Sequence, residues 1–218
     1  MNTRAFISYS TTDKHIAGAL RAILAELEID AFLAHEDIAV SEEWRQKLLE
    51  EISRTEIFVC ILSKAYFASP WCIQESGIAA FRKEVTIIPL SVDGSSPKGF
   101  FSNVQATKID IDSLSIKDLL PGFLKHNFDR AIAIILKVIA QSRSFRSAES
   151  NFQLILPHLE GLGEKHVQEL LEQCAANDQI HHASLCAKNY IPPLLKSHGH
   201  LLKRNTRALL KNACKQYA

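Results

Sequence analysis

Glycine is scarce in this chain, which has only eight glycines among 218 residues. They never fall in the spacing G-x-G-x-x-G, nor in the G-x-x-x-x-G-K-[ST] spacing of a P-loop. Both motifs hold phosphates by letting backbone N–H groups come close to them, which bulkier residues obstruct. The sequence therefore excludes the two common glycine-rich nucleotide sites.

Long apolar runs are also lacking. The longest of them, such as residues 57–62, fall far short of the ~18 residues that span a bilayer. Residues 1–4 lead directly into a strand pattern, with no secretion signal visible. We therefore expect a cytoplasmic protein that has no membrane contact.

The five cysteines give no pattern for disulfides or metals. Their number is odd and their spacing is wide, which is typical of reduced cysteines in the core of a cytosolic protein. The closest metal-like groupings are His181-His182 with Cys186, and His198 with His200. Both are too loose for a zinc site, so the sequence predicts no bound metal.

Net charge is small as well, at +1 with a sequence pI near 7.7. Such a chain has no overall field that attracts a polyanion, so we expect that nucleic acid is not a partner. From residue 191 onward the charged residues are all basic, namely Lys196, Lys203, Arg204, Arg207, Lys211 and Lys215. This segment fits a solvated helix face, or a tail docked on the body, better than a nucleic-acid or membrane contact.

What the first 110 residues do contain is an alternation of short β-rich runs with amphipathic helical runs. This order is typical of βαβ units that build a parallel sheet. The continuous apolar run 57–62 predicts a central strand covered on both faces. Strands are expected at residues 5–9, 30–34, 57–62, 85–92 and 107–111. Helices are expected after Asp13 and Ser41, each of which can cap the helix that follows it, and from Pro70, with a loop or short turn at residues 63–69.

The rest of the chain has only helical patterns. Apolar residues at Phe128, Ile132, Ile135 and Ile139 predict a helix that closes the sheet domain. Residues 141–151 are polar and serine-rich, which favours a linker. We therefore expect an α/β domain with a doubly wound five-stranded parallel sheet over residues 1–142, and a helical C-terminal extension over residues 143–218.

The position of a site follows from this fold. In an open parallel sheet, ligands bind beyond the carboxyl ends of the strands, where the connecting loops converge. Here those loops supply hydroxyls, two carboxylates, an indole and a helix start that carries Glu75. A phosphoacceptor receiver site is excluded, because the first strand ends in Phe-Ile-Ser-Tyr-Ser instead of paired carboxylates.

Three segments of the chain resemble the successive boxes of a Toll/interleukin-1 receptor (TIR) domain. They are Phe-Ile-Ser-Tyr-Ser at 6–10, His-Glu-Asp-Ile at 35–38 followed by Ser-Glu-Glu-Trp at 41–44, and Leu-Ser at 62–63 leading to Ser-Pro-Trp-Cys-Ile-Gln-Glu at 69–75. The resemblance covers about residues 3–140 and is specific, because the boxes fall in the right order on the right elements. The bacterial-style Trp-Cys-x-x-Glu box is its strongest part.

The resemblance implies a flavodoxin-like sheet, self-association through TIR–TIR contacts and, in the enzymatic branch, cleavage of NAD+ to nicotinamide and ADP-ribose or a cyclic isomer. NAD+ would be the substrate, and no separate cofactor is implied. The glutamate four residues after the tryptophan is catalytic in such enzymes, and it corresponds to Glu75. The loop 35–40 would border the NAD+ site and mediate self-association. It lacks the Pro-Gly pair of many receptor-type members, so receptor-like partner rules are not assumed.

A single carboxylate is chemically sufficient for this reaction. Ordinary glycosidases need two carboxyls because one must protonate a poor leaving group. Nicotinamide instead leaves as a neutral pyridine, so Glu75 can hydrogen-bond the ribose hydroxyls and stabilise the oxocarbenium-like transition state, or trap it covalently. Trp71 lies one helical turn before Glu75, where its indole can form a wall of the site. The substrate-binding residues predicted on this basis are Ser8, Tyr9, Ser10, Asp37, Ser69 and Trp71.

The sequence analysis leads to an NAD+ nucleosidase or ADP-ribosyl cyclase, acting in bacterial antiphage defence, whose product a separate effector senses. The first alternative is a non-catalytic TIR scaffold that only recruits other TIR chains. A weaker one is a nucleoside deoxyribosyltransferase, which would release base from a nucleoside and leave NAD+ untouched. Some of the predicted roles also have plainer alternatives, since Asp37 could simply fix its loop and Ser69 could simply position Pro70.

Overall fold

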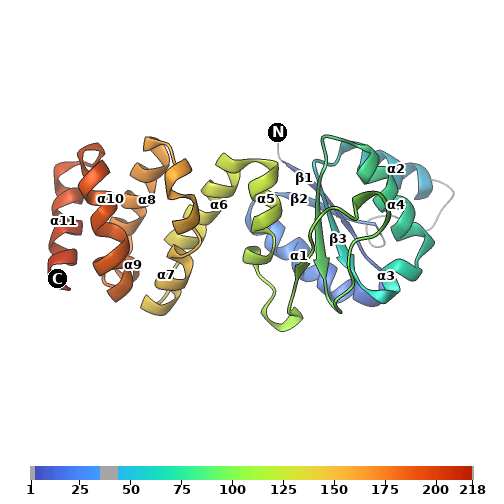
Figure 1. Cartoon of the computed structure of the whole chain (residues 1–218), viewed down its shortest axis with the longest axis horizontal. Helices are drawn as coiled ribbons and strands as arrows, with labels where there is room; N and C mark the ends of the chain where they lie inside the picture. The colour runs from blue at the N-terminus through green and yellow to red at the C-terminus, as the bar shows by residue number, and fades with distance from the viewer. Residues whose placement is uncertain (1–2, 35–43, 218) are drawn as a thin grey trace. The chain divides into compact units, whose positions relative to one another are not determined.

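The computed structural model describes residues 3–34 and 44–217. Contacts divide the chain into two compact units, Met1–Asn127 and Phe128–Ala218. In Figure 1 the first unit is coloured from blue to yellow-green and contains every described strand, while the second, from yellow to red, contains helices only.

The first unit is built on a parallel sheet of five strands in the order β2-β1-β3-β4-β5. The strands are β1 (Arg4–Ser8), β2 (Asp30–Leu33), β3 (Ile57–Leu62), β4 (Thr86–Ser91) and β5 (Thr107–Lys108). This order is that of the flavodoxin-like doubly wound sheet. The fold class expected from the sequence is therefore confirmed.

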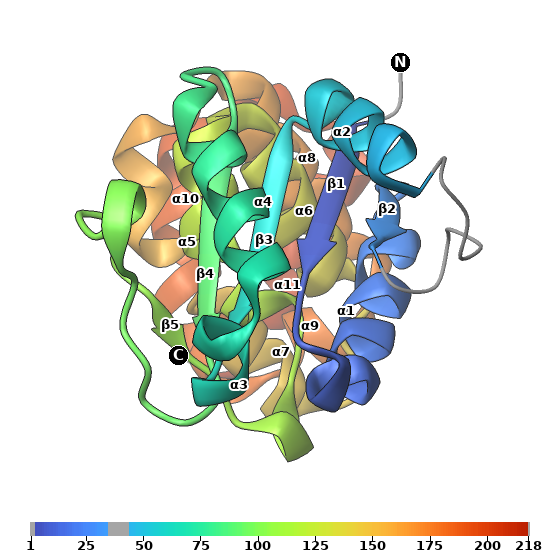
Figure 2. The ribbon, with the colours of Figure 1, turned by 90° about the vertical axis from the view of Figure 1, so that its right-hand side faces the viewer.

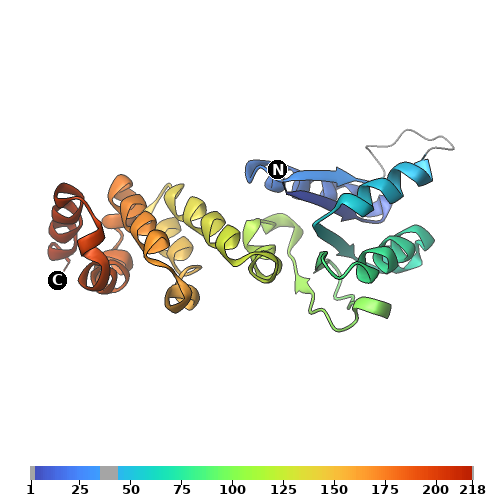
Figure 3. The ribbon, with the colours of Figure 1, turned by 90° about the horizontal axis from the view of Figure 1, so that it is seen from above.

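Helices cover both faces of this sheet. Figure 2 shows α2 and α4 in front of the strands and α5 behind them, and Figure 3 shows the same separation from above. The helices are α1 (Lys14–Glu26), α2 (Trp44–Arg54), α3 (Lys64–Ala68), α4 (Pro70–Phe81) and α5 (Leu120–His126). Short 3-10 turns are η1 (Thr11–Asp13), η2 (Gly99–Phe101), η3 (Ile111–Ser113) and η4 (Ile116–Asp118).

The face under α2 and α4 holds the core that leads to the site. Phe6 of β1 packs there with Phe58 and Cys60 of β3, and all three are buried. Leu48 of α2 and Ala79 of α4 close the same cluster. Because side chains alternate along a strand, Ser8 lies on the same face of β1 as Phe6. The end of β1 therefore directs a hydroxyl toward α4.

Two segments of the first unit differ from their expected form. Residues 63–69, expected as a loop, contain helix α3, which Ser63 begins by accepting a hydrogen bond from the Tyr66 backbone N–H at 3.0 Å. The last strand ends at Lys108 instead of residue 111, because the chain turns into η3. As a result β5 pairs with β4 only at Leu90 and Ser91.

The second unit is entirely helical over its described residues. Its helices are α6 (Phe128–Ala140), α7 (Phe145–Phe152), α8 (Glu164–Ala176), α9 (Asp178–His181), α10 (Ile191–His198) and α11 (Arg204–Lys215), with the 3-10 turns η5 (Leu156–Gly161) and η7 (Gly199–Leu201) and a π-helix η6 (Cys186–Tyr190). None of the helices in the described ranges is long and apolar enough to cross a membrane.

The expected linker at residues 141–151 is wrong over most of its length, because helix α7 begins at Phe145. Ser144 and Ser147 form a capping box, in which each side chain accepts the backbone N–H of the other, at 3.1 and 3.0 Å. The serines therefore start a helix instead of interrupting one. Helix α6 packs on α7 and α8, so the division of the chain after residue 142 stays a prediction.

Candidate active site

The start of helix α4 fixes the position of the predicted catalytic residue. Ser69 accepts a hydrogen bond from the Cys72 backbone N–H at 3.4 Å, and Pro70 occupies the first turn. A side-chain acceptor followed by proline is a strong helix start, because it satisfies one free N–H and the ring removes another. Trp71 and Glu75 then stand one turn apart on α4.

Glu75 is fully buried, yet it has no charged partner among the described residues. The Ser8 hydroxyl donates to Glu75 Oε2 at 2.5 Å, which joins the end of β1 to helix α4. The other carboxylate oxygen, Oε1, has no hydrogen-bond partner among the described residues. No lysine, arginine or histidine in the described ranges forms an ion pair with this carboxyl. A buried carboxylate oxygen without a partner is costly, and this one keeps an unused capacity to accept a hydrogen bond.

Burial also changes the acidity of this carboxyl. Desolvation raises the pKa of Glu75 to about 7, and the hydrogen bond from Ser8 opposes that rise. At this pKa the carboxyl is present in both protonation states near neutral pH. A strongly shifted carboxyl without a structural ion pair is typical of a functional group.

Ser8 belongs to a longer series of buried hydroxyls, which we call the Glu75 hydroxyl chain. Ser8 Oγ lies 3.0 Å from Tyr66 Oη, and Tyr66 Oη lies 2.6 Å from Ser76 Oγ. Ser76 Oγ in turn lies 2.7 Å from the carbonyl oxygen of Cys72. Burial holds the pKa of the Tyr66 phenol well above its usual range, so the phenol keeps its proton. The chain thus links β1, α3 and α4 through donors that remain protonated.

Trp71 stands at the edge of this arrangement. Its side chain is 37% exposed, and its ring meets that of Trp44 from α2 edge-on, with centroids 4.2 Å apart and planes at 89°. An edge-on pair of this kind holds both indoles in place. The exposed part of Trp71 can therefore serve as a fixed aromatic surface.

Comparison with models of protein families matches residues 5–120 to the family described as TIR domain. The match covers more than half of the chain. The chain belongs to the TIR domain family. No curated protein matches it. The family assignment agrees with the sheet order and with the positions of the first and third sequence boxes, which begin within β1 and at the end of β3. Residues 35–43 of the second box lie outside the described residues.

The remaining residues predicted to bind substrate lie in different surroundings within the TIR domain. Tyr9 is fully buried, and Ser10 is nearly so, with its hydroxyl accepting from Thr12 at 3.1 Å. The hydroxyl of Ser69 caps α4. Asp37 lies outside the described residues. Contact of these residues and of Trp71 with a substrate stays a prediction, and so does the catalytic role of Glu75.

The structure adds residues that sequence reasoning missed. Tyr66 was not predicted as part of the site, because residues 63–69 were expected to form a loop or short turn. Ser76 was also missed, although it stands on the helix expected from Pro70. A second unpredicted contact joins two loops at the carboxyl edge of the sheet. Ser63 donates to the Asp13 carboxylate at 2.7 Å, whereas Asp13 had been expected to cap α1 with its own side chain and makes no such bond.

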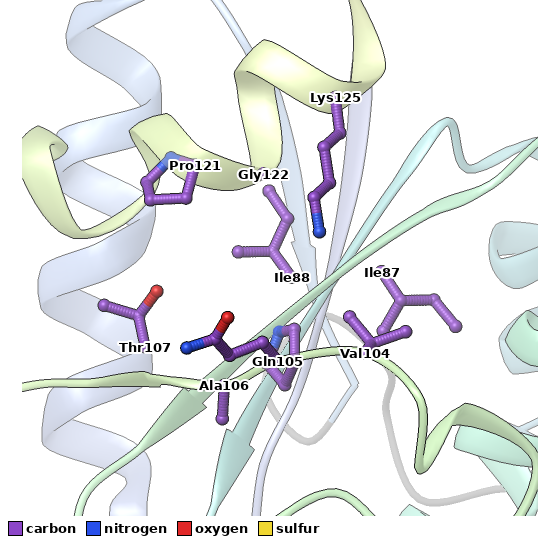
Figure 4. A pocket seen from close by; sticks show the side chains of 10 residues that line it. Ile87, Ile88, Val104, Gln105, Ala106, Thr107, Pro121, Gly122 and Lys125 are labelled. Atoms are coloured by element: carbon purple, nitrogen blue, oxygen red, sulfur yellow. The ribbon is translucent and has the colours of Figure 1, made fainter.

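Two cavities of the TIR domain lie away from the Glu75 carboxylate. One of about 380 Å³ borders the outer edge of β4, where Figure 4 shows Lys125 and Gln105 around Ile88. Another, of about 330 Å³, is the α3–α4 cavity, lined by Phe67, Ile73, Ser76, Gly77 and residues 98–101. No group of three metal-binding side chains occurs in the part of the chain that the structure describes.

Proposed function

We propose that this TIR domain is an NAD+ glycohydrolase or ADP-ribosyl cyclase of the bacterial enzymatic type. It would break the bond between nicotinamide and ribose and release nicotinamide with ADP-ribose or a cyclic isomer. The observation that supports this most is Glu75, whose buried carboxylate is held through one oxygen by Ser8 and has no partner at the other. A carboxylate that served only the fold would be expected to have an ion pair or a full set of donors.

The chemistry requires little else from the protein. As the glycosidic bond breaks, its electron pair leaves with nicotinamide, which becomes neutral, and positive charge develops on the ribose. A carboxylate in a dry environment stabilises that charge more strongly than one in water. Trp71, one turn before Glu75 and fixed by Trp44, offers a surface on which the nicotinamide or adenine ring can stack.

The wider role that we propose is cytoplasmic defence signalling. Depletion of NAD+, or production of a nucleotide read by a separate effector, would carry the signal. Self-association through TIR–TIR contacts would complete the active site. The described cysteines are all free thiols, which fits a reducing compartment.

The test is nicotinamide release from NAD+ by concentrated, purified protein, followed by chromatography. Glu75→Ala should lower the turnover number by roughly 10² or more, as loss of a central electrostatic group does. Glu84→Ala removes an exposed carboxylate just beyond α4 and should leave turnover unchanged. Unchanged release by a folded Glu75→Ala protein would refute the assignment, and mass analysis of the products would separate linear from cyclic ADP-ribose.

A second candidate function is a non-catalytic scaffold that acts by TIR–TIR association. The full burial of Glu75 favours it, because a substrate must reach the carboxylate before any reaction. Under this alternative the assembled protein would release no nicotinamide at any concentration. Release of base from a nucleoside, with NAD+ left intact, would instead indicate a deoxyribosyltransferase.

A further inference from the structure

The Glu75 hydroxyl chain does not end within the protein core. Its last hydroxyl, that of Ser76, lines the α3–α4 cavity of about 330 Å³. Ser8, Tyr66 and Ser76 are all buried, and each lies within hydrogen-bond distance of the next. The Glu75 hydroxyl chain therefore connects the fully buried Glu75 carboxyl with the α3–α4 cavity on another side of helix α4.

The hydroxyls of the Glu75 hydroxyl chain can all point toward the carboxylate when Glu75 is ionised. Ser8 has a single proton, which points to Glu75 Oε2, so its 3.0 Å contact with Tyr66 is a hydrogen bond when Tyr66 donates to Ser8 and not to the Cys72 carbonyl oxygen 3.3 Å away. Tyr66 has then used its own proton, and the 2.6 Å contact requires Ser76 to donate to Tyr66. All three hydroxyls thus point toward the carboxylate.

The arrangement reverses when Glu75 is protonated. The carboxyl then donates to Ser8, Ser8 donates to Tyr66, and Tyr66 donates to Ser76. The Ser76 proton is left for the Cys72 carbonyl oxygen, 2.7 Å away, which can only accept. In this arrangement each hydroxyl donates once and accepts once. When Glu75 is ionised, Ser76 instead points its proton to Tyr66 and gives up its hydrogen bond to the Cys72 carbonyl oxygen, so the hydroxyls can serve either protonation state of Glu75 by reversing direction.

We propose that Ser8, Tyr66 and Ser76 form a proton path between Glu75 and the α3–α4 cavity. This inference rests on the proposed function, since hydrolysis of NAD+ by water yields nicotinamide, ADP-ribose and one proton. When the acceptor water adds to the ribose carbon, its proton passes to Glu75 as the general base. The path removes that proton without requiring the carboxyl to meet solvent directly.

The transfer balances at every atom. The proton on Glu75 moves to Ser8 Oγ, the proton of Ser8 moves to Tyr66 Oη, and the proton of Tyr66 moves to Ser76 Oγ. The original proton of Ser76 turns from the Cys72 carbonyl oxygen and leaves to water in the α3–α4 cavity, so one proton enters the Glu75 hydroxyl chain and one leaves it. After these transfers each hydroxyl points back toward Glu75, which is the arrangement that serves the ionised carboxylate. Rotation of the three hydroxyls then prepares the path for the next proton. The three residues act on the reaction only through Glu75.

No other described titratable group competes in this region. The titratable neighbours of the Glu75 hydroxyl chain are the thiols of Cys60 on β3 and Cys72 on α4. Burial raises the pKa of Cys72 to about 11 and that of Cys60 further still, so both thiols stay neutral at physiological pH. Changes in the titration of Glu75 can therefore be assigned to the hydroxyls.

The first experiment tests the coupling without any turnover. Carbon-13 NMR of protein labelled at the glutamate side-chain carboxyl follows the titration of Glu75, whose signal is identified by its loss in Glu75→Gln. Tyr66→Phe removes one hydroxyl and should raise the titration midpoint by on the order of one pH unit, because bonds that support a charged group are the stronger ones. The control is Ser91→Ala, which removes a buried hydroxyl that has no partner in the described structure and should leave the midpoint in place.

The second experiment tests the cavity end of the path. A Cβ added at Gly77 meets no atom within 4 Å, so Gly77→Leu can fill the α3–α4 cavity while leaving all three hydroxyls intact. Gly77→Leu and Ser76→Ala should each lower kcat for nicotinamide release by on the order of tenfold, with the KM for NAD+ unchanged. A merely structural role would be expected to change KM or folding instead.

Each outcome decides one part of the proposal. A Tyr66→Phe midpoint equal to that of Ser91→Ala would overturn the coupling of the hydroxyls to Glu75. Values of kcat for both Gly77→Leu and Ser76→Ala equal to that of Ser91→Ala would overturn the path to the cavity. If wild-type protein releases no nicotinamide at any concentration, the proposed function fails together with the transfer step, while a shifted midpoint in Tyr66→Phe would still support the coupling.

Discussion

At the scale of single residues, Glu75 is where the needs of the fold and of the proposed reaction conflict. A buried carboxylate with one unpartnered oxygen opposes folding when it is ionised. Gln at this position would keep the shape and accept the Ser8 hydrogen bond without the charge. Residues that weaken the fold in this way are commonly retained for function, because activity and stability place different demands on a site.

The cost of this charge gives a prediction about stability. Burial raises the folded-state pKa of Glu75 from 4.5 to about 7, so the folded protein holds this proton more tightly between those values. The stabilisation from protonated Glu75 is therefore complete below pH 4.5 and is lost as the pH rises through about 7. Relative to Glu75→Gln, wild-type protein should lose up to about 3 kcal/mol of unfolding free energy over this range.

Urea unfolding at about pH 5 and pH 8 measures this difference. Glu160→Gln, which changes an exposed carboxylate in the helical unit, serves as the control and should follow wild type at both values. A constant difference between wild type and Glu75→Gln across the range would contradict the raised acidity of Glu75.

The same titration predicts the pH dependence of the proposed reaction. Only ionised Glu75 stabilises a cationic ribose, so kcat/KM for nicotinamide release should rise as the pH increases through about 7 and then level off. The measurement is nicotinamide release between about pH 5.5 and pH 9 at low NAD+ concentration. A rate that is flat or that falls through neutrality would argue against an ionised Glu75 as the active form.

At the scale of elements, the contact between α5 and β4 depends on a glycine. A Cβ at Gly122 of α5 would come within 2.4 Å of Ile88 Cγ1 and 2.5 Å of its Cδ1 on β4. Gly122→Ala should therefore reduce the unfolding free energy by about 1 to 3 kcal/mol through overpacking. Gly18→Ala in α1 is the matched control, because a Cβ there meets nothing within 4 Å and should stabilise the helix by roughly 0.5 to 1 kcal/mol.

Thermal or urea unfolding of both variants measures this contrast. If Gly122→Ala proved as stable as wild type while Gly18→Ala gained stability, Ile88 would have to adjust freely, and the close approach of α5 would not need glycine. The pair therefore separates packing from helix propensity.

Elements with strong periodic signals could be predicted from the sequence, and short ones could not. The apolar run 57–62 indicated a central strand, and β3 is buried along its whole length. Helix α3 has only five residues, which is too short for a periodic pattern, so the position of Tyr66 could not be foreseen. The serines near Ser144 have the composition of a linker, and only their mutual hydrogen bonds show that they start a helix.

The candidate site shows the same division. The spacing of Trp71 and Glu75 on one helix face could be read from the sequence, since a proline marked the helix start. The sequence placed Ser8 among the substrate-binding residues, which stays a prediction, and only the structure shows that its hydroxyl donates to Glu75. Burial of Glu75 depends on packing among distant segments of the chain, which no local pattern records.

At the scale of the whole molecule, the proposed reaction depends on how many copies meet. If TIR–TIR contacts complete the active site, the turnover number per chain should rise with protein concentration and reach a plateau. Nicotinamide release measured over a hundredfold range of concentration, beside sedimentation analysis of the same samples, tests this. A turnover number that is independent of concentration, in protein that stays monomeric, would show that one chain is sufficient.

The short length of strand β5 affects whether copies of the protein can aggregate through the edge of the sheet. Among the described strands, it leaves residues 86–89 of β4 without a paired neighbour on their outer side, where residues 104–106 and helix α5 border a cavity, and an unpaired strand edge can recruit foreign strands into fibrous aggregates. The backbone N–H groups of Thr86 and Val92 point to the β3 side of β4. Because successive residues of a strand direct their backbone groups to opposite sides, the backbone nitrogen of Pro89 faces the outer edge, where proline has no N–H to donate. This proline limits unwanted strand addition at that edge, which would help the chain crowd together without precipitating.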